Sequence, residues 1–238
     1  AQQVDRRGSG DGPLADYGLL YPLETVAIRD APATGSHHPV ILFSHGHGGS
    51  RHQSLFLTEQ LASHGFVVAA VDHPNDTLWD LDIDLTPEVA ARRPDDVRFA
   101  LDWLLEAHAE PGGWLEGRID PDRIGALGHS FGAWTSVVLG GGVVDPAAAA
   151  EYCFGEDPAG CGVVGSIDPN LPAPLADPRV GATMALAPGG WYSFSDLADV
   201  GPVLVVAGSR DGDLPYEEEQ VPLFELLGTP KTLMTLAD

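Results

Sequence analysis

Positive charge is scarce in this sequence. Twelve lysine and arginine residues stand against 35 aspartate and glutamate residues, the net charge is −23 at pH 7, and Lys231 is the single lysine. Phosphate backbones and anionic lipid surfaces attract basic patches and repel acidic ones. The composition therefore predicts a chain that binds neither nucleic acid nor anionic membranes, with an acidic surface that serves solubility.

Long apolar runs are missing and cysteine is rare. No run approaches the roughly 20 apolar residues that a membrane-spanning helix needs, so we expect no membrane span. Cys153 and Cys161 stand eight positions apart in a stretch rich in glycine and proline. We favour a disulfide that closes this loop, with two free thiols as the alternative. The disulfide implies a secreted or periplasmic protein, because it needs an oxidising compartment.

The order of apolar runs predicts an α/β fold in one domain over residues 1–238. Short runs typical of buried strands occur at 39–44, 66–71, 123–127, 182–186, 203–207 and 232–236, with a further strand expected at 25–28. Helical spacing occurs at 53–64, 95–109, 133–139 and 217–227. The alternation predicts a mostly parallel sheet with helices on both faces. Residues 141–179 do not follow this alternation of strands and helices. We expect an irregular insertion there, over the catalytic end of the sheet.

The motif Gly128-His129-Ser130-Phe131-Gly132 lies between a predicted strand and a predicted helix. This is the context that a G-x-S-x-G nucleophile turn requires, since the turn lifts the serine hydroxyl above the end of the sheet. Small residues are needed on both sides because the turn is crowded. We therefore predict Ser130 as a nucleophile; a plain glycine–serine turn is the alternative.

Other strand ends carry groups that would assist this serine. The backbone N–H of Phe131 is one expected oxyanion donor, and the N–H of His47, in the glycine-rich segment after the 39–44 strand, is the other. Asp211 follows the 203–207 strand, where an acid that orients a catalytic histidine belongs. Asp213 is the second choice, and two solvated turn carboxylates are the alternative.

Aromatic side chains after the 182–186 strand are candidates for substrate contact. Trp191 and Tyr192 are predicted to form an apolar wall for an acyl or aromatic group, with simple packing as the alternative. We predict no metal. Two metal sites remain as lesser alternatives, one for a transition metal and one for calcium, on these residues: His45, His47 and His52; Asp80, Asp82 and Asp84.

Several segments together resemble a known family. They are residues 41–46, 61–66, 71–77, 123–132 and 185–188. In them the chain resembles an α/β-hydrolase, and within that fold the bacterial dienelactone-hydrolase-like and platelet-activating-factor-acetylhydrolase-like esterases, with a more distant resemblance to polyester-degrading cutinases. The resemblance implies a serine hydrolase that needs no cofactor and cleaves carboxylic esters, either short-chain acyl esters or polyesters.

The same resemblance assigns roles and exposes one departure. Ser130 is the implied nucleophile, Asp211 the acid, and His47 and Phe131 the oxyanion donors. The family places its histidine base after the last core strand, but no histidine follows His129 here. We expect the base beyond Asp238, in a segment that this sequence lacks; His73 is a weak substitute. The competing hypothesis is a non-catalytic binding protein of the same fold. Nothing in the sequence indicates an oligomeric state.

Overall fold

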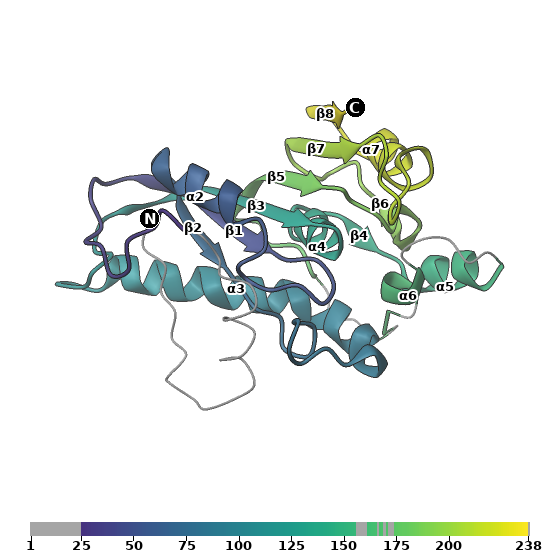
Figure 1. Cartoon of the computed structure of the whole chain (residues 1–238), viewed down its shortest axis with the longest axis horizontal. Coiled ribbons are helices and arrows are strands. Elements are labelled where there is room, and N and C mark those ends of the chain that lie inside the picture. The colour runs from purple at the N-terminus through teal and green to yellow at the C-terminus, as the bar shows by residue number, and fades with distance from the viewer. Residues whose placement is uncertain (1–24, 156–160, 166, 169, 171–173, 238) are drawn as a thin grey trace.

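A six-stranded parallel sheet forms the centre of the computed structural model, which describes residues 25–155, 161–165, 167–168, 170 and 174–237 (Figure 1). The strand order is β2-β1-β3-β5-β7-β8. The strands are β1 (His38–Ser44), β2 (Val67–Ala70), β3 (Ile119–His129), β5 (Val180–Leu186), β7 (Val203–Gly208) and β8 (Lys231–Leu236). The predicted α/β-hydrolase arrangement is confirmed, but residues 25–28, predicted as a strand, have no regular structure.

Helices cover both faces of this sheet. Helix α2 (Leu55–Ser63) packs beside β2, whereas α3 (Thr86–Ala109) and α4 (Phe131–Leu139) pack against each other on the opposite side (Figure 1). Helix α7 (Val221–Leu226) follows the π-helical turn η3 (Tyr216–Gln220). Among the described helices, none combines the length and the apolar character that crossing a bilayer requires.

Helix α4 is buried on every side, and its residues are apolar except for Thr135 and Ser136. Its polar side chains are satisfied locally: the Thr135 hydroxyl donates to the Phe131 carbonyl, and the Ser136 hydroxyl donates to the Gly132 carbonyl. The Trp134 indole N–H donates to Ser193 Oγ at 2.8 Å. Burial without unpaired polar groups anchors the helix that begins directly after Ser130.

Helix α3 is longer than the sequence predicts. It begins at Thr86 rather than near Asp95, because Pro94 does not end it. The residues on its early turns, Val89 and Ala90, belong to the main core cluster, so packing outweighs the hydrogen bond that a proline removes. The part of α3 before residue 95 also includes Arg93, which contacts residues of the candidate site described below.

Residues 141–179 leave the sheet after α4 and return at β5. They form β4 (Val143–Val144), which pairs in antiparallel fashion with β6 (Phe194–Asp196), and the helices α5 (Pro146–Gly155) and α6 (Cys161–Val164). The prediction of an irregular segment is therefore wrong over α5. The helices lie at the end of the sheet where β1 and β3 finish (Figure 1).

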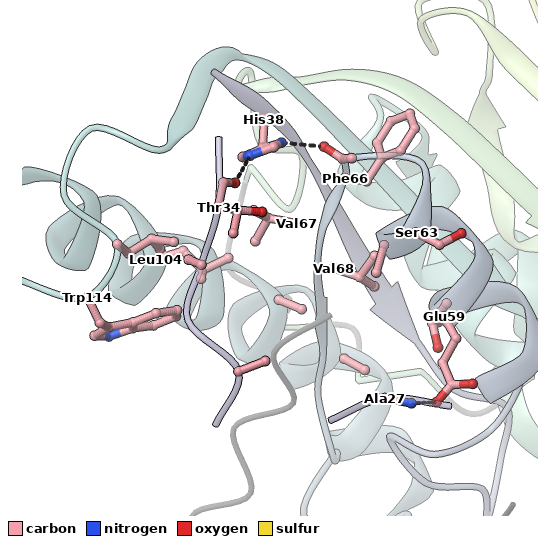
Figure 2. A pocket seen from close by; sticks show the side chains of 18 of the residues that line it. Ala27, Thr34, His38, Glu59, Ser63, Phe66, Val67, Val68, Leu104 and Trp114 are labelled. Atoms are coloured by element: carbon pink, nitrogen blue, oxygen red, sulfur yellow. Dashed lines mark hydrogen bonds between the residues drawn. The ribbon is translucent and has the colours of Figure 1, made fainter. Parts of the chain in front are cut away.

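A cavity of about 450 Å³ lies at the β2 edge of the sheet, and Figure 2 shows part of its lining. Side chains of α2, β2 and α3 line it, and the His38 ring bridges the carbonyl oxygens of Thr34 and Gly65 beside it. It shares no lining residue with the pocket beside Ser130. Chemistry at Ser130 therefore has to use the smaller pocket.

Candidate active site

Ser130 stands in a strained turn between β3 and α4. Its backbone has φ 54° and ψ −119°, a region that residues with a side chain rarely adopt. The Ser130 N–H donates to the Leu186 carbonyl at 2.9 Å, and its own carbonyl accepts the N–H groups of Ala133 and Trp134. These bonds hold the strained conformation and leave the half-buried side chain at the end of the sheet.

The two glycines of the motif are required by close backbone approach. A Cβ atom on Gly128 would overlap the Gly132 carbonyl, and one on Gly132 would overlap the Ser44 carbonyl at the end of β1. The turn, the start of α4 and the end of β1 are therefore packed backbone to backbone. The spacing of glycines that predicted the turn is explained by these contacts.

In the segment after β1, the backbone N–H of His47 lies between two neighbours that are held by hydrogen bonds. The Gly46 N–H donates to Gln53 Oε1 at 2.7 Å and the Gly48 N–H donates to Asp76 Oδ1 at 2.8 Å, so both neighbours of His47 are fixed. Within the described part of the chain, neither the His47 N–H nor the Phe131 N–H has a protein acceptor. A virtual Cβ on Gly46 would lie 3.3 Å from Ser130 Cβ, which places this segment against the serine.

A buried ion pair, Arg93 with Asp76, packs against this segment. Arg93 donates to Asp76 Oδ2 at 2.7 Å and to the His45 carbonyl at 2.8 Å, and its guanidinium lies 4.2 Å from the centre of the Phe131 ring. His47 Nδ1 lies 2.7 Å from Asp76 Oδ1, although not in line for a straight hydrogen bond. The pair therefore contacts both residues that offer an oxyanion donor. Sequence reasoning missed Arg93 and Asp76, whose charges are brought together only by the fold.

Burial also fixes the state of Arg93 and Asp76. Desolvation lowers the pKa of Arg93 to about 10, while the Asp76 carboxylate opposes that shift, so the guanidinium stays charged at neutral pH. Burial raises the pKa of Asp76, but the close His47 ring, Arg93 and the Gly48 N–H together hold it below its usual value. Two opposite charges with satisfied hydrogen bonds are the stable arrangement at such a site.

His45 does not serve as a metal ligand in this arrangement. Its Nδ1–H donates to the Gly46 carbonyl at 2.7 Å, and its Nε2 accepts the His73 N–H at 3.2 Å, so the protein uses both ring nitrogens. Burial and the nearby Arg93 lower the pKa of His45 to about 4, which keeps the ring neutral. In the described chain no three His, Cys, Asp or Glu side chains gather as a metal would require, including Asp80, Asp82 and Asp84.

Asp211 lies where the sequence predicts an acid, directly after β7. Its Oδ1 accepts the N–H groups of Asp213 and Leu214, and its Oδ2 accepts a hydrogen bond from Gln220 Nε2 at 3.0 Å. The side chain of Asp213, the second choice, is exposed to solvent. The network around Gln220 was not foreseen, because a glutamine inside a helical pattern gives no sequence signal.

The end of β8 lies beside the Asp211 loop. Leu236 pairs with Gly208, and the Ser209 N–H donates to the Leu236 carbonyl at 3.0 Å. Residues that follow β8 therefore emerge next to Asp211. Of the described histidines, His73 is wholly buried and bonded to Ser44 rather than to Ser130. His129 interacts electrostatically with Asp211, but burial lowers its pKa and no hydrogen bond joins it to Ser130.

A small apolar pocket of about 40 Å³ opens beside Ser130. Its lining comes from α4, from α6 and from two loops: Phe131, Trp134, Val163, Val164, Gly189, Gly190 and Leu214. The insertion thus contributes one wall, as predicted for a segment over the catalytic end. Trp191 and Tyr192 do not line the pocket; they cluster with Tyr152 behind Gly190, and their role in substrate binding stays a prediction.

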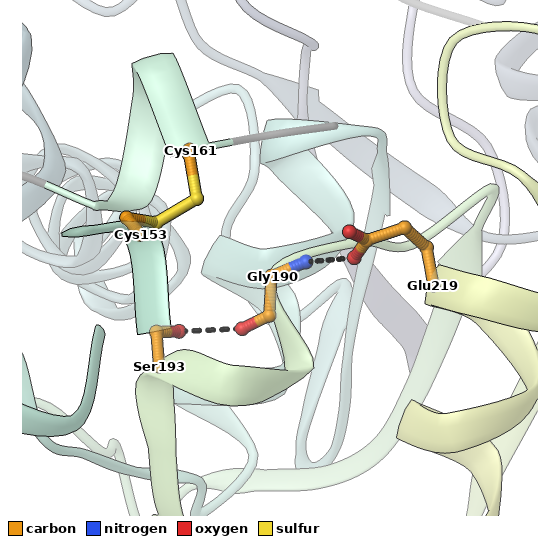
Figure 3. Close-up of a disulfide and its surroundings, with 5 residues drawn as sticks. All are labelled: Cys153, Cys161, Gly190, Ser193 and Glu219. Carbon is orange, nitrogen blue, oxygen red and sulfur yellow. Dashed lines mark hydrogen bonds between the residues drawn. A yellow bond between two sulfur atoms is a disulfide. The ribbon is translucent and has the colours of Figure 1, made fainter. Parts of the chain in front are cut away.

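Cys153 and Cys161 form a disulfide that joins α5 to α6 (Figure 3). Nearby, the Gly190 N–H donates to Glu219 Oε2 at 2.8 Å, and Ser193 Oγ donates to the Gly190 carbonyl at 2.6 Å. The Val164 side chain meets Gly190 so closely that a Cβ there would lie 2.9 Å from Val164 Cγ2. The disulfide therefore fixes the helix that supplies the pocket wall.

Comparison with known proteins agrees with this geometry. Residues 23–79, which include β1, His47 and Asp76, match the family model for platelet-activating factor acetylhydrolase, isoform II. The platelet-activating factor acetylhydrolase of Cavia porcellus is 29% identical over 139 residues, covering 44% of this chain and 32% of that protein. Cutinase est1 of Thermobifida alba is 34% identical over 101 residues, covering 42% of this chain and 30% of that protein.

A third relative, Cutinase 2 of Thermobifida cellulosilytica, is 31% identical over 101 residues, covering 42% of this chain and 34% of that protein. The chain spans about a third of the length of the curated relatives it matches. The predicted resemblance is confirmed: this chain has the α/β-hydrolase arrangement and is similar in sequence to platelet-activating factor acetylhydrolases and cutinases.

Proposed function

We propose that this chain is the core of a serine esterase that hydrolyses carboxylic esters through an acyl-enzyme on Ser130. The observation that carries the proposal is the joint placement of a strained serine, two unpaired backbone N–H groups and an apolar pocket at one end of the sheet. Similarity to platelet-activating factor acetylhydrolases and cutinases supports the same class of reaction.

In this mechanism Ser130 Oγ attacks the ester carbonyl while its proton passes to a histidine base. The His47 and Phe131 N–H groups bind the oxyanion that forms, and each such donor is worth about 3 kcal/mol of barrier. The histidine then gives the proton to the leaving alcohol, and the acyl group stays on Ser130. Water attacks the acyl-enzyme with the same base, which releases the acid and restores the serine.

The base is a histidine in residues that follow β8, beyond Asp238. Two features support this position: Leu236 pairs with Gly208 beside the Asp211 loop, and no described histidine is bonded to Ser130. Asp211 accepts the second ring N–H of that histidine and stabilises its charged form. The reaction needs no cofactor.

Short acyl groups suit the pocket. The pocket is small, about 40 Å³, and its lining is mostly apolar. We therefore expect an acetyl-sized group to bind there better than a long chain. Polyesters with short repeating acids are the alternative substrate that the cutinase similarity supports. The disulfide supports export to an oxidising compartment.

Turnover of p-nitrophenyl esters tests this function. The 238-residue chain is compared with a form that carries the natural continuation after Asp238, each with and without Ser130→Ala. We expect the extended form to hydrolyse acetate faster than hexanoate, and Ser130→Ala to abolish both reactions. An extended form that binds ester-like ligands without turnover would instead support the non-catalytic binding protein.

A further inference from the structure

Three consecutive residues of the π-helical turn η3 reach three parts of the site. The Trp191 indole N–H donates to the Glu218 carbonyl, the Gly190 N–H donates to Glu219 Oε2, and Gln220 Nε2 donates to Asp211 Oδ2. Short π-helical segments cost regular hydrogen bonding and occur often at functional sites. Here the turn joins the wall beside the Ser130 pocket to the loop that carries the acid.

The amide of Gln220 is wholly buried, and both its nitrogen and its oxygen form hydrogen bonds. Nε2 donates to Asp211 Oδ2 at 3.0 Å and to the Leu214 carbonyl at 2.6 Å, while Oε1 accepts the Gly208 N–H at 3.2 Å. The opposite assignment of the amide would set its oxygen against two acceptors and its NH₂ against a donor. The orientation is therefore determined by the surroundings.

This amide controls the direction of the Asp211 carboxylate. Oδ1 is occupied by the N–H groups of Asp213 and Leu214, and Gln220 takes one lone pair of Oδ2. The remaining lone pair of Oδ2 is left for a donor that arrives from outside the loop. A carboxylate held on both oxygens cannot rotate to follow its partner, so the partner must meet it at Oδ2.

We propose that Gln220 is the positioning residue of the catalytic acid, and that it turns Asp211 Oδ2 toward the ring N–H of the histidine base. The proposal rests on the proposed function and adds a residue to its machinery. Gln220 touches no substrate; it acts through Asp211. Misplacement of a catalytic group by about 1 Å lowers the rate by about 100-fold. Replacement of the carboxylate that orients a catalytic histidine lowers the rate by up to about 10⁴-fold.

Two variants of the extended chain test the proposal. Gln220→Met keeps the length of the side chain and removes its donor, so kcat should fall by about 10- to 100-fold while KM changes by less than about twofold. Gln220→Glu keeps the acceptor for the Gly208 N–H but sets a second carboxyl against Asp211. The two carboxyls share a proton at low pH and repel each other once it is lost.

The pH dependence separates positioning from a loss of fold. For Gln220→Glu, the ratio of its kcat/KM to that of the unchanged protein should fall as pH rises, whereas for Gln220→Met the ratio should stay level. Charged or titratable groups near the pair include Arg210 and Asp213 beside Asp211, Glu218 and Glu219 beside Gln220, and His129, and all are retained in both variants. Gln60→Met, on the exposed side of α2, is the matched control and should leave kcat unchanged.

The outcomes are distinct. Unchanged kcat and an unchanged pH profile in Gln220→Met and Gln220→Glu would overturn the role of Gln220 while the esterase stands. Equal losses in both variants at every pH, accompanied by a lower folded fraction in urea, would also overturn it, in favour of a merely structural residue. An unchanged extended chain without any turnover would overturn the proposed function itself.

Discussion

Ser44 and Ser130 differ in both their hydrogen bonds and their exposure to solvent. Ser44, at the end of β1, belongs to a complete Ser–His–Asp series: its Oγ lies 2.9 Å from His73 Nε2, and His73 Nδ1 lies 2.8 Å from Asp96 Oδ2. Ser130, at the end of the neighbouring strand β3, has no histidine bonded to it among the described residues. By hydrogen bonds alone, Ser44 is the better nucleophile.

Access and electrostatics reverse that ranking. Ser44 is 1% exposed and His73 0%, and Arg93 donates to Ser44 Oγ at 3.1 Å. Burial first, and then Arg93 and His45, hold the pKa of His73 well below its ordinary value, so the ring is neutral and satisfied. Ser130 instead has a strained backbone, a pocket and free N–H donors. A nucleophile is recognised by access to substrate and by oxyanion donors, not by a series of side chains.

Exchange of each serine for alanine gives the largest expected contrast. In the extended chain, Ser130→Ala should lower kcat by about 10⁶-fold, because the acyl-enzyme cannot form. Ser44→Ala should leave kcat within a few-fold and lower the free energy of unfolding by about 1–3 kcal/mol, because Arg93 and His73 lose a buried partner. Ester turnover and urea unfolding measure the two effects. A folded Ser44→Ala protein without activity would invert the comparison.

Asp76 contacts the surroundings of both serines through Arg93. We expect the next largest effect on stability when the charge of Asp76 is removed. Asp76→Asn leaves Arg93 buried without its counter-ion, which should cost about 3–5 kcal/mol of stability. It should also lower kcat, because the segment around His47 loses its support. Asp102→Asn is the control: it breaks an exposed pair with Arg179 and should cost less than about 1 kcal/mol. Equal costs in urea would show that the buried pair is not the support we describe.

The disulfide should matter for Ser130 and not for Ser44, because only the Ser130 pocket uses α6. Replacing Cys153 and Cys161 by serine opens a loop of eight residues and should cost about 2–3 kcal/mol. The preference for acetyl over hexanoyl esters should weaken as Val164 moves away from Gly190. Competition between the two esters measures this preference. An unchanged ratio would separate the disulfide from the pocket.

A buried carboxyl on the Ser130 side gives an effect that depends on pH and does not involve turnover. Burial raises the pKa of Glu219 from 4.5 to about 7. The folded state thus holds a proton that the unfolded state has lost, so this group's contribution to stability falls as pH rises from about 4.5 to about 7 and is constant above. Glu219→Gln should remove that fall, which is about 3 kcal/mol. Urea unfolding at pH 5 and pH 8 tests it; parallel curves for both proteins would contradict it.

The sequence predicts the sheet and the turn at Ser130 well for a physical reason. The strands are short apolar runs, and the turn is a fixed spacing of two glycines around a serine, so both signals lie close together in the chain. Three predictions are wrong: a strand at 25–28, an irregular segment where α5 forms, and a start of α3 near residue 95. At these places packing overrides local preference.

The supporting residues are a different matter. Asp76, Arg93 and Gln220 meet their partners only after folding, and two of them are charged residues that composition places on the surface. Nothing in their neighbourhood along the chain marks them. The deceptive Ser44–His73–Asp96 series shows the converse, since its members become a series only in the fold and its burial removes it from the chemistry.

Mass spectrometric mapping of a fluorophosphonate label would show which serine is the nucleophile. The extended chain is labelled, digested with trypsin and searched for the modified serine; cleavage at Arg51 and Arg123 places Ser44 and Ser130 in different peptides. We expect the label on Ser130 alone, with none on Ser44 and none after Ser130→Ala. A label on Ser44, or labelling that survives Ser130→Ala, would contradict it.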